Sequence, residues 1–174
     1  MSINNSNPCQ IKELNLSCWG CCGREFKSKA EVERDLKINT KIFKKIKTPS
    51  TVKLLLFRDR LGHPDDLMPS GLCSNLIDFK DNCVACPLHK FANEIIPKNK
   101  FLAIHKKDLR KNHCDINYEC ITFKIWKKLS NKQKNEYIKF LSKKTFNHYE
   151  YSLKNHDGII IEEFLNKKNI QIDF

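Results

Sequence analysis

The stretch Leu16–Phe26, which reads L-S-C-W-G-C-C-G-R-E-F, places three thiols within five residues, those of Cys18, Cys21 and Cys22. A C-x-x-C segment can bend back so that both sulfurs face one metal ion, and the glycines of this stretch relieve the turn. The adjacent pair Cys21 and Cys22 differs, because consecutive side chains of an extended backbone point apart. Two neighbouring thiolates rarely serve one tetrahedral ion, so the pair indicates a second metal, a cluster, or one thiol that binds nothing.

A second C-x-x-C lies at Cys83 and Cys86, and the chain of 174 residues holds nine cysteines in all. Two such clusters on a short chain are typical of metal ligands. Zinc and iron–sulfur clusters both accept four thiolates, so we expect zinc or iron as the cofactor, an iron–sulfur cluster included. The spacing alone predicts a site made of Cys18, Cys21, Cys83 and Cys86, or of a permutation that includes Cys22 and Cys73.

The sequence carries no pattern of export or membrane insertion. No apolar segment of seven or more residues follows a basic start within the first thirty residues. No run reaches the roughly eighteen apolar residues of a membrane span. We therefore expect a cytoplasmic protein without a membrane partner, whose thiols stay reduced and act as ligands. Cys9 has no partner at ligand spacing, and for this residue alone we expect a buried thiol that binds no metal.

Length and pattern predict a mainly α fold with a short β-hairpin, in a small cysteine-rich single domain stapled by metal. Residues 1–8 are polar and expected to form a flexible tail. Residues 9–120 are expected to form the cysteine-cluster metal-binding domain, and residues 121–174 a helical extension packed on it. The last third is basic: residues 98–174 hold seventeen Lys and Arg against nine Asp and Glu, within a net charge of +12.

Two helices are expected after the first cysteine cluster. Ser28 and Glu31 form an S-x-x-E capping box, and apolar residues follow at helical spacing, which predicts a helix over about residues 29–47. The apolar stretch 52–61 predicts a second helix with Gly62 just past its end. A short apolar run also fits a strand, and this alternative stays open.

A hairpin is expected around the polar turn at residues 80–82, and its arms would deliver Cys73 and Cys83 to neighbouring points. A short helix is expected from Cys86 through Ile95. Together these elements predict a metal knuckle built on a hairpin.

The last third is expected to be helical. Ser130 and Gln133 form another capping box that opens a helix, and Asp157 is expected to cap a final helix over residues 159–168. The helix before Ser130 is expected to place four residues on one apolar face: Tyr118, Ile121, Ile125 and Leu129.

The cysteines also carry a resemblance to a known family. C-W-G-C-C-G at Cys18–Gly23 is followed by G-x-C-x-x-L at Gly71–Leu76 and by a further cysteine before a Cys-Pro pair. This pattern resembles the YkgJ-like cysteine-cluster family, the CxxCxxCC zinc- or iron-chelating domain. Asn15 stands where that family has its first cysteine, and Cys9 is an alternative for the missing ligand. The family's eight cysteines correspond most naturally to Cys18, Cys21, Cys22, Cys73, Cys83, Cys86, Cys114 and Cys120.

Three functions fit these observations. The resemblance implies a metal-chelating protein, and one branch of the family, described as flagellin lysine methylase, implies a metal-dependent modifying enzyme. A nucleic-acid-binding zinc module that uses the basic last third is the third hypothesis. Lys outnumbers Arg twenty-seven to five, and no run of Lys or Arg exceeds two residues. We therefore expect, besides the metal ion, only an acidic protein or weak, non-specific nucleic acid as partner.

Other side chains of catalytic type are few. His63, Asp65 and Asp66 fall in an H-P-D-D segment, and such loop residues more often form a turn or a cap. His89 and His113 stand beside cysteines, and imidazole is an alternative fourth ligand for zinc. The sequence leaves the identity of any catalytic residue unknown.

Overall fold

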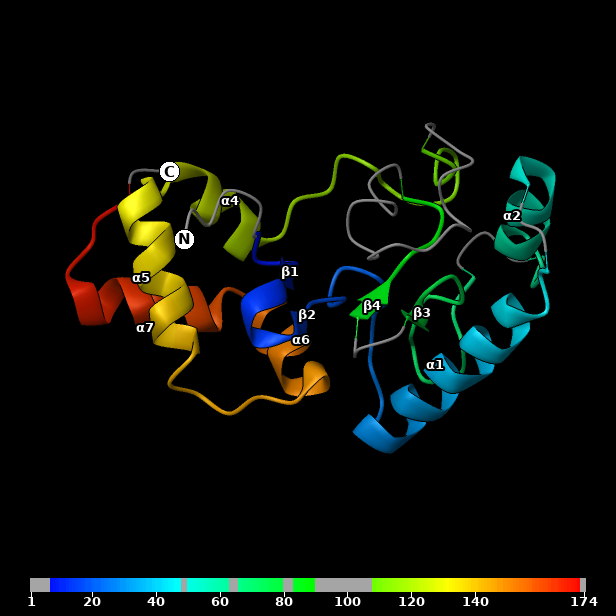
Figure 1. The fold of residues 1–174 in the computed structure, drawn as a ribbon, viewed down its shortest axis with the longest axis horizontal. Helices are drawn as coiled ribbons and strands as arrows, with labels where there is room; N and C mark the ends of the chain where they lie inside the picture. The colour runs from blue at the N-terminus through cyan, green and yellow to red at the C-terminus, as the bar shows by residue number, and fades with distance from the viewer. Residues whose placement is uncertain (1–6, 48–49, 63–65, 80–82, 90–107, 173–174) are drawn as a thin grey trace. The chain divides into compact units, whose positions relative to one another are not determined.

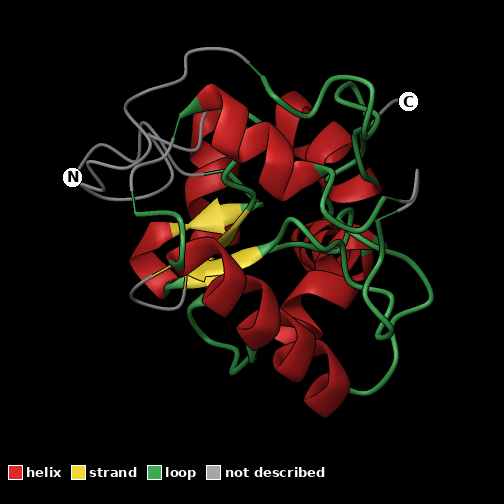
Figure 2. Cartoon of the chain, turned by 90° about the vertical axis from the view of Figure 1, so that its right-hand side faces the viewer, coloured by secondary structure: helices red, strands yellow, loops and turns green. Residues whose placement is uncertain are grey.

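The fold is known here from a computed structural model that describes residues 7–47, 50–62, 66–79, 83–89 and 108–172. The chain divides into two compact units: unit 1 joins residues 1–21 to residues 119–174, and unit 2 is residues 22–118. Within the described ranges, helices predominate and the strands form short antiparallel pairs (Figure 2). The predicted mainly α fold with a short β-hairpin is confirmed.

Unit 1 begins with a small hairpin of β1 (Gln10–Ile11) and β2 (Leu16–Ser17), in which Gln10 pairs with Ser17 and Ile11 with Leu16. Asn15 turns the chain between the strands, because its left-handed backbone (φ 49°) lets its N–H reach the Lys12 carbonyl at 3.2 Å. The second stretch of unit 1 forms the helices α4 (Ile121–Lys128), α5 (Asn131–Leu141), α6 (His148–His156) and α7 (Ile159–Lys168), drawn from green to red in Figure 1.

Polar side chains set where α5 and α6 begin. The predicted capping box of α5 is confirmed: the Gln133 N–H donates to Ser130 Oγ at 3.3 Å, and the Ser130 N–H donates to Gln133 Oε1 at 2.8 Å. Asn147 and Glu150 form the same arrangement at the start of α6, a helix that the sequence reasoning did not predict.

Helix α7 has the predicted range, but its predicted cap was wrong. Gly158 is the N-cap residue, in a left-handed conformation (φ 81°), and Asp157 ends α6 instead. A β-carbon on Gly158 would lie 2.6 Å from Ile121 Cγ2 as well as in a strained backbone, so glycine is required at this turn. The prediction failed because an Asp before a helix fits both the end of one helix and the start of the next.

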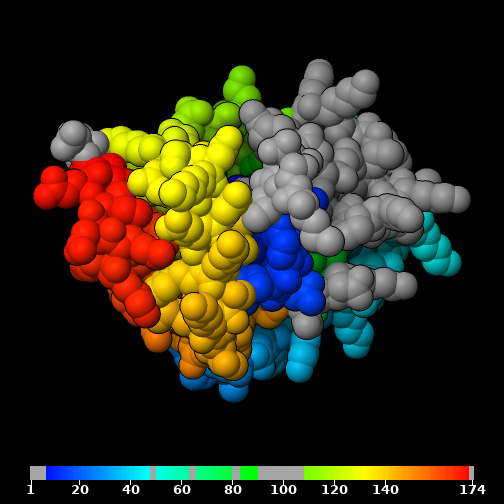
Figure 3. All heavy atoms as spheres, turned by 60° about the vertical axis from the view of Figure 1, so that its left-hand side comes forward, coloured from blue at the N-terminus to red at the C-terminus, as the bar shows by residue number. Residues whose placement is uncertain are grey.

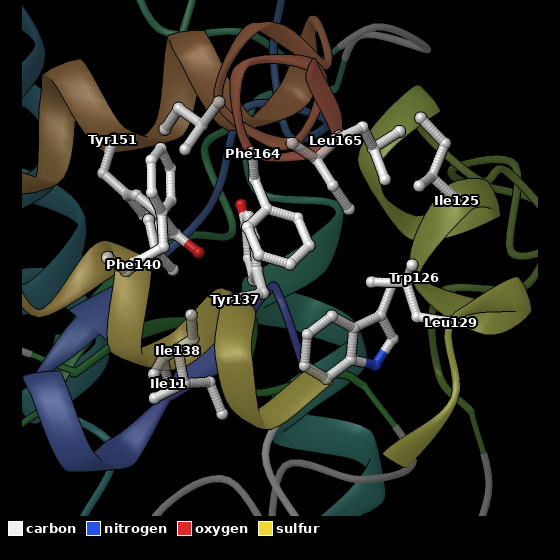
Figure 4. Close-up of a cluster of buried hydrophobic side chains, with 13 residues drawn as sticks. Ile11, Ile125, Trp126, Leu129, Tyr137, Ile138, Phe140, Tyr151, Phe164 and Leu165 are labelled. Atoms are coloured by element: carbon white, nitrogen blue, oxygen red, sulfur yellow. The ribbon is translucent and has the colours of Figure 1, made fainter. Parts of the chain in front are cut away.

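The apolar core of unit 1 lies between its helices and the β1–β2 hairpin (Figure 4). The Tyr137 ring meets Phe164 edge-on, with ring centroids 5.3 Å apart, and Trp126 with centroids 5.8 Å apart. The space-filling view shows the blue N-terminal residues of the hairpin against the orange surface of α6 (Figure 3).

The apolar face predicted around α4 is only half right. Ile125 and Leu129 are buried, but Tyr118 and Ile121 are 51% and 45% exposed. Trp126 is buried next to Ile125. The error has a physical reason: α4 begins only at Ile121, so Tyr118 precedes the helix and does not follow its period.

Unit 2 contains α1 (Lys29–Lys44), α2 (Thr51–Arg58), and the antiparallel strands β3 (Ile77–Phe79) and β4 (Cys83–Ala85), in which Phe79 pairs with Cys83. Its core gathers aromatic rings from three elements, because the Phe43 centroid lies 5.2 Å from that of Phe57 and 6.3 Å from that of Phe79. Thr40 ties α1 to β3, since its Oγ1 accepts the Asp78 N–H at 2.8 Å.

The two helices predicted after the first cysteine cluster are confirmed. The Ser28–Glu31 capping box opens α1, and the stretch after Ser50 is a helix, so the alternative strand was wrong. Helix α2 ends at Arg58, whereas Gly62 lies further on with a φ of 68° and does not directly follow the helix. The hairpin forms, but its turn at residues 80–82 lies outside the described residues.

Cys73 precedes β3 and is not part of a hairpin arm, so that prediction was wrong. Residues 90–95 of the helix expected after Cys86 lie outside the described residues. None of the helices in the described ranges is long and apolar enough to cross a membrane.

Candidate metal centre

Four thiols gather in unit 1, and we call them the tetrad: Cys9, Cys18, Cys21 and Cys120. Every pair among the four interacts electrostatically, since the charge of one thiolate raises the pKa of the other. They come from three places in the chain: before β1, after β2, and before α4. Clustering of all four thiols from such separated segments is a property of the fold and not of local sequence.

The β1–β2 hairpin brings the first two members together. Cys9 precedes β1 and Cys18 follows β2, so the antiparallel register places them opposite each other. The Cys18 N–H donates to the Cys9 carbonyl at 2.8 Å and extends the ladder by one bond. Cys9, which we expected to bind no metal, is therefore a neighbour of the C-x-x-C segment.

Helix α6 holds the three segments through one residue, Asn155, which is fully buried. Its Nδ2 donates to the Pro8 carbonyl at 3.1 Å, next to Cys9. Its carbonyl accepts the hydroxyl of Thr122, two residues after Cys120. Its side chain also donates a hydrogen bond to the sulfur of Cys18 and lowers the pKa of that thiol. One side chain and one carbonyl thus connect all three cysteine-bearing segments.

Ser152, one helical turn earlier on α6, adds further bonds to the C-x-x-C segment. Its Oγ accepts the Trp19 N–H at 3.1 Å and donates to the Ser17 carbonyl at 3.3 Å. Its carbonyl lies 3.7 Å from the Cys18 sulfur. Gly20 permits this close approach, because a β-carbon there would lie 2.5 Å from the Ser152 carbonyl and 2.4 Å from Cβ of His156. Glycine in this stretch therefore serves contact with α6.

Burial is the main influence on the protonation of three thiols of the tetrad, those of Cys9, Cys18 and Cys120. It raises the pKa of Cys18 to about 12, and the backbone N–H of Gly20 only partly offsets this by donating to the sulfur. Burial also raises the pKa of Cys9 and of Cys120. The backbone N–H groups of Phe123 and Thr122 at the start of α4 lower the pKa of Cys120. Without a cation these thiols stay protonated at neutral pH, and a bound dication would compensate their charge.

The other cysteines lie in unit 2: Cys22, Cys73, Cys83, Cys86 and Cys114. All nine cysteines fall in the described ranges, and no disulfide links any of them. The residues of the two C-x-x-C segments, which spacing alone combined into one site, belong to different units. Among the residues that the structure describes, no three His, Cys, Asp or Glu side chains already stand in the arrangement of a metal site.

The histidines singled out in the sequence have other neighbours. His113 lies with Nδ1 3.4 Å from Asp66 Oδ2 and Nε2 2.8 Å from the Asn75 amide nitrogen. The His89 N–H donates to the Cys86 carbonyl at 3.2 Å. His63 and Asp65 lie outside the described residues.

Several lysines of the basic last third are engaged by neighbouring carboxylates. Lys144 lies 2.7 Å from Glu163 and also over the Phe140 ring, 4.8 Å from its centroid. Two more ion pairs join Lys127 to Glu119 at 2.5 Å and Lys168 to Glu136 at 3.3 Å. These contacts reduce the charge that unit 1 can offer to a polyanion.

Comparison with known proteins identifies no relative, because no family model, no curated protein and no solved structure matches this chain. The interpretation of the tetrad therefore depends on its own residues.

Proposed function

We propose that this chain is a cytoplasmic metal-binding protein and that the tetrad is a metal centre holding zinc or iron, the iron as an iron–sulfur cluster. The observation that carries this proposal is that each of the four thiols interacts electrostatically with the other three. The thiols come from three separate segments, which hydrogen bonds connect to α6. Four thiolates form the closed ligand set of a structural zinc site and of a cysteine-bound cluster. The resemblance to the cysteine-cluster family stays a prediction and agrees with this class.

Backbone donors support the same proposal. The N–H groups of Gly20 and Thr122 donate to the sulfurs of Cys18 and Cys120, each from two residues further along the chain. Such bonds stabilise the charged thiolate and orient it, as hydrogen-bond donors to metal ligands do. Asn155 adds a side-chain donor to Cys18.

The first experiment compares the metal content of the wild type with that of Cys120→Ser, after anaerobic purification with a reductant. The wild type should carry zinc or iron in stoichiometric amount, and the variant should lose the metal of the tetrad because a serine hydroxyl is a poor ligand for either metal. The matched control is Ser142→Ala, an exposed position at the end of α5. Elemental analysis with an absorption spectrum gives the readout. A wild type with only trace metal, or a Cys120→Ser variant with unchanged content, would contradict the proposal.

For partners we propose, besides the metal, a weak attraction to acidic proteins or to nucleic acid without sequence preference. Unit 1 contains lysines but no arginine. A lysine ammonium group is a point charge, and it lacks the paired donors with which a guanidinium group recognises the edge of a base. Binding to two unrelated DNA duplexes should be equal and should fall steeply between low and near-physiological salt as counterions are released. Tight binding that survives salt and differs between the duplexes would favour the nucleic-acid module instead.

A further inference from the structure

A second group of thiols lies in unit 2 and is not explained by the tetrad. Cys73, Cys86 and Cys114 interact electrostatically in every pair, as the members of the tetrad do. We call these three residues the triad. Burial raises the pKa of Cys73 to about 11 and raises that of Cys86 further, whereas Cys114 is exposed. One exposed thiol beside two half-buried ones gives the group an opening to solvent.

Hydrogen bonds fix the segments that carry the triad. The Leu109 N–H donates to the Leu88 carbonyl at 3.0 Å, which joins the chain after Cys86 to the chain before Cys114. The contact between the Asn75 amide and the His113 ring, 2.8 Å long, joins the chain after Cys73 to the same segment. The convergence of the triad therefore has a backbone and side-chain basis apart from its charges.

The triad repeats the backbone chemistry of the tetrad. The N–H of Asn75 donates to the Cys73 sulfur, and the N–H of Leu88 donates to the Cys86 sulfur. Both donors lie two residues after their cysteine, as Gly20 does after Cys18. Donors at this position stabilise a thiolate, which is the form that binds metal.

Two arginines distinguish the triad from the tetrad. The charge of Arg60 lowers the pKa of Cys73, and that of Arg110 lowers the pKa of Cys86, although burial dominates both thiols. Arg60 is held by the Asn39 side chain at 2.9 Å and by the face of the Phe57 ring. Four thiolates on a dication leave about −2 in net charge, and nearby guanidinium groups reduce the cost of burying it.

Cys22 is the thiol best situated to complete the triad. Its carbonyl accepts the Cys73 N–H at 2.9 Å, and the next residue, Gly23, forms a bridge with Leu72. Cys83 instead lies on β4 opposite Phe79. It packs against the apolar core of unit 2, as Cys86 also does.

We propose that unit 2 holds a second metal centre, separate from the tetrad, in which Cys22, Cys73, Cys86 and Cys114 bind a thiophilic metal, either zinc or the iron of an iron–sulfur cluster. The proposal rests on the function proposed above, since it uses the same chemistry at another site. It also assigns the adjacent cysteines to different metal centres, because Cys21 belongs to unit 1 and Cys22 to unit 2. Cys83 is left outside both centres.

The test titrates Zn²⁺ into the metal-depleted, reduced full-length protein under anaerobic conditions and measures bound zinc per chain. The wild type should bind two equivalents, whereas Cys86→Ser and Cys120→Ser should each bind one. Cys114→Ser, which alters an exposed thiol, serves as a second variant of unit 2 and should also bind one. The matched control Cys83→Ser should keep two.

The outcomes separate this inference from the proposed function. One equivalent in the wild type, kept in Cys86→Ser and Cys114→Ser but lost in Cys120→Ser, would overturn the second centre and leave the tetrad intact. Loss of all zinc in every one of these three variants would mean one shared centre and would also overturn it. A Cys83→Ser variant that binds one equivalent would overturn the assigned ligand set. No bound zinc in the wild type, together with only trace zinc and iron in the protein as purified anaerobically, would overturn the proposed function itself.

Discussion

Removing the metal should lower the melting midpoint of the protein by about 10 °C or more, because binding free energy at thiolate sites is largely folding free energy. The effect should be greater in unit 2 than in unit 1. Among the residues that the structure describes, the main apolar cluster of unit 1 gathers thirteen buried residues and that of unit 2 gathers eight. We expect the unit with the smaller described cluster to depend more on ligation.

Circular dichroism and fluorescence together measure this difference. Both tryptophans, Trp19 and Trp126, belong to unit 1 and are buried. In a Trp19→Phe variant the remaining Trp126 reports only on the helical core. After chelation, helical signal should fall in part while Trp126 emission stays that of a buried indole. A melting curve unchanged after verified metal removal would show that no metal supports the fold.

Asn155→Ala should lower the affinity of the tetrad for metal by about 10- to 100-fold, although it removes no thiol. Residues that orient metal ligands have effects of this size. The substitution removes the side-chain donor to Cys18 and the bond to the Pro8 carbonyl. It also removes the acceptor of the fully buried Tyr137 hydroxyl, 3.4 Å away, which should cost about 1–3 kcal/mol of unfolding free energy.

The matched control is Asn166→Ala, because Asn166 is an exposed residue of the neighbouring helix α7. Metal competition titrations and thermal melts of both variants give the comparison. Equal affinity in Asn155→Ala and the wild type would mean that α6 does not organise the tetrad.

The sequence was sufficient where local chemistry decides structure. The capping boxes at Ser28 and Ser130 predicted the starts of α1 and α5, and the predicted range of α7, residues 159–168, is the observed one. Helix α6 was missed because its start is marked by Asn147 with Glu150, a capping box outside the Ser and Thr pattern.

The composition of the candidate site could be predicted only in part. The thiol-rich segments were evident, but their grouping depends on contacts between distant residues. Cys9 lies beside Cys18 because β1 and β2 pair over two residues each. Strands this short, joined by a polar segment around Asn15, leave no recognisable pattern in the sequence. Cys120 lies near them because α6 contacts the segment that carries it, through Thr122 and Asn155. The spacing of cysteines in the sequence cannot predict such a contact.

The order of residues in unit 1 has a consequence for the newly made chain. Ninety-eight residues, including all of unit 2, separate Cys21 from Cys120. At about 5–20 residues per second, the ribosome needs roughly 5–20 s to add them. During that interval three thiols of the tetrad exist without the fourth, and helix α6, which fixes their positions, has not been synthesised. Unit 2 can acquire all of its cysteines first, so metal supplied during translation would meet the complete ligand set proposed for unit 2 before the set proposed for unit 1 exists.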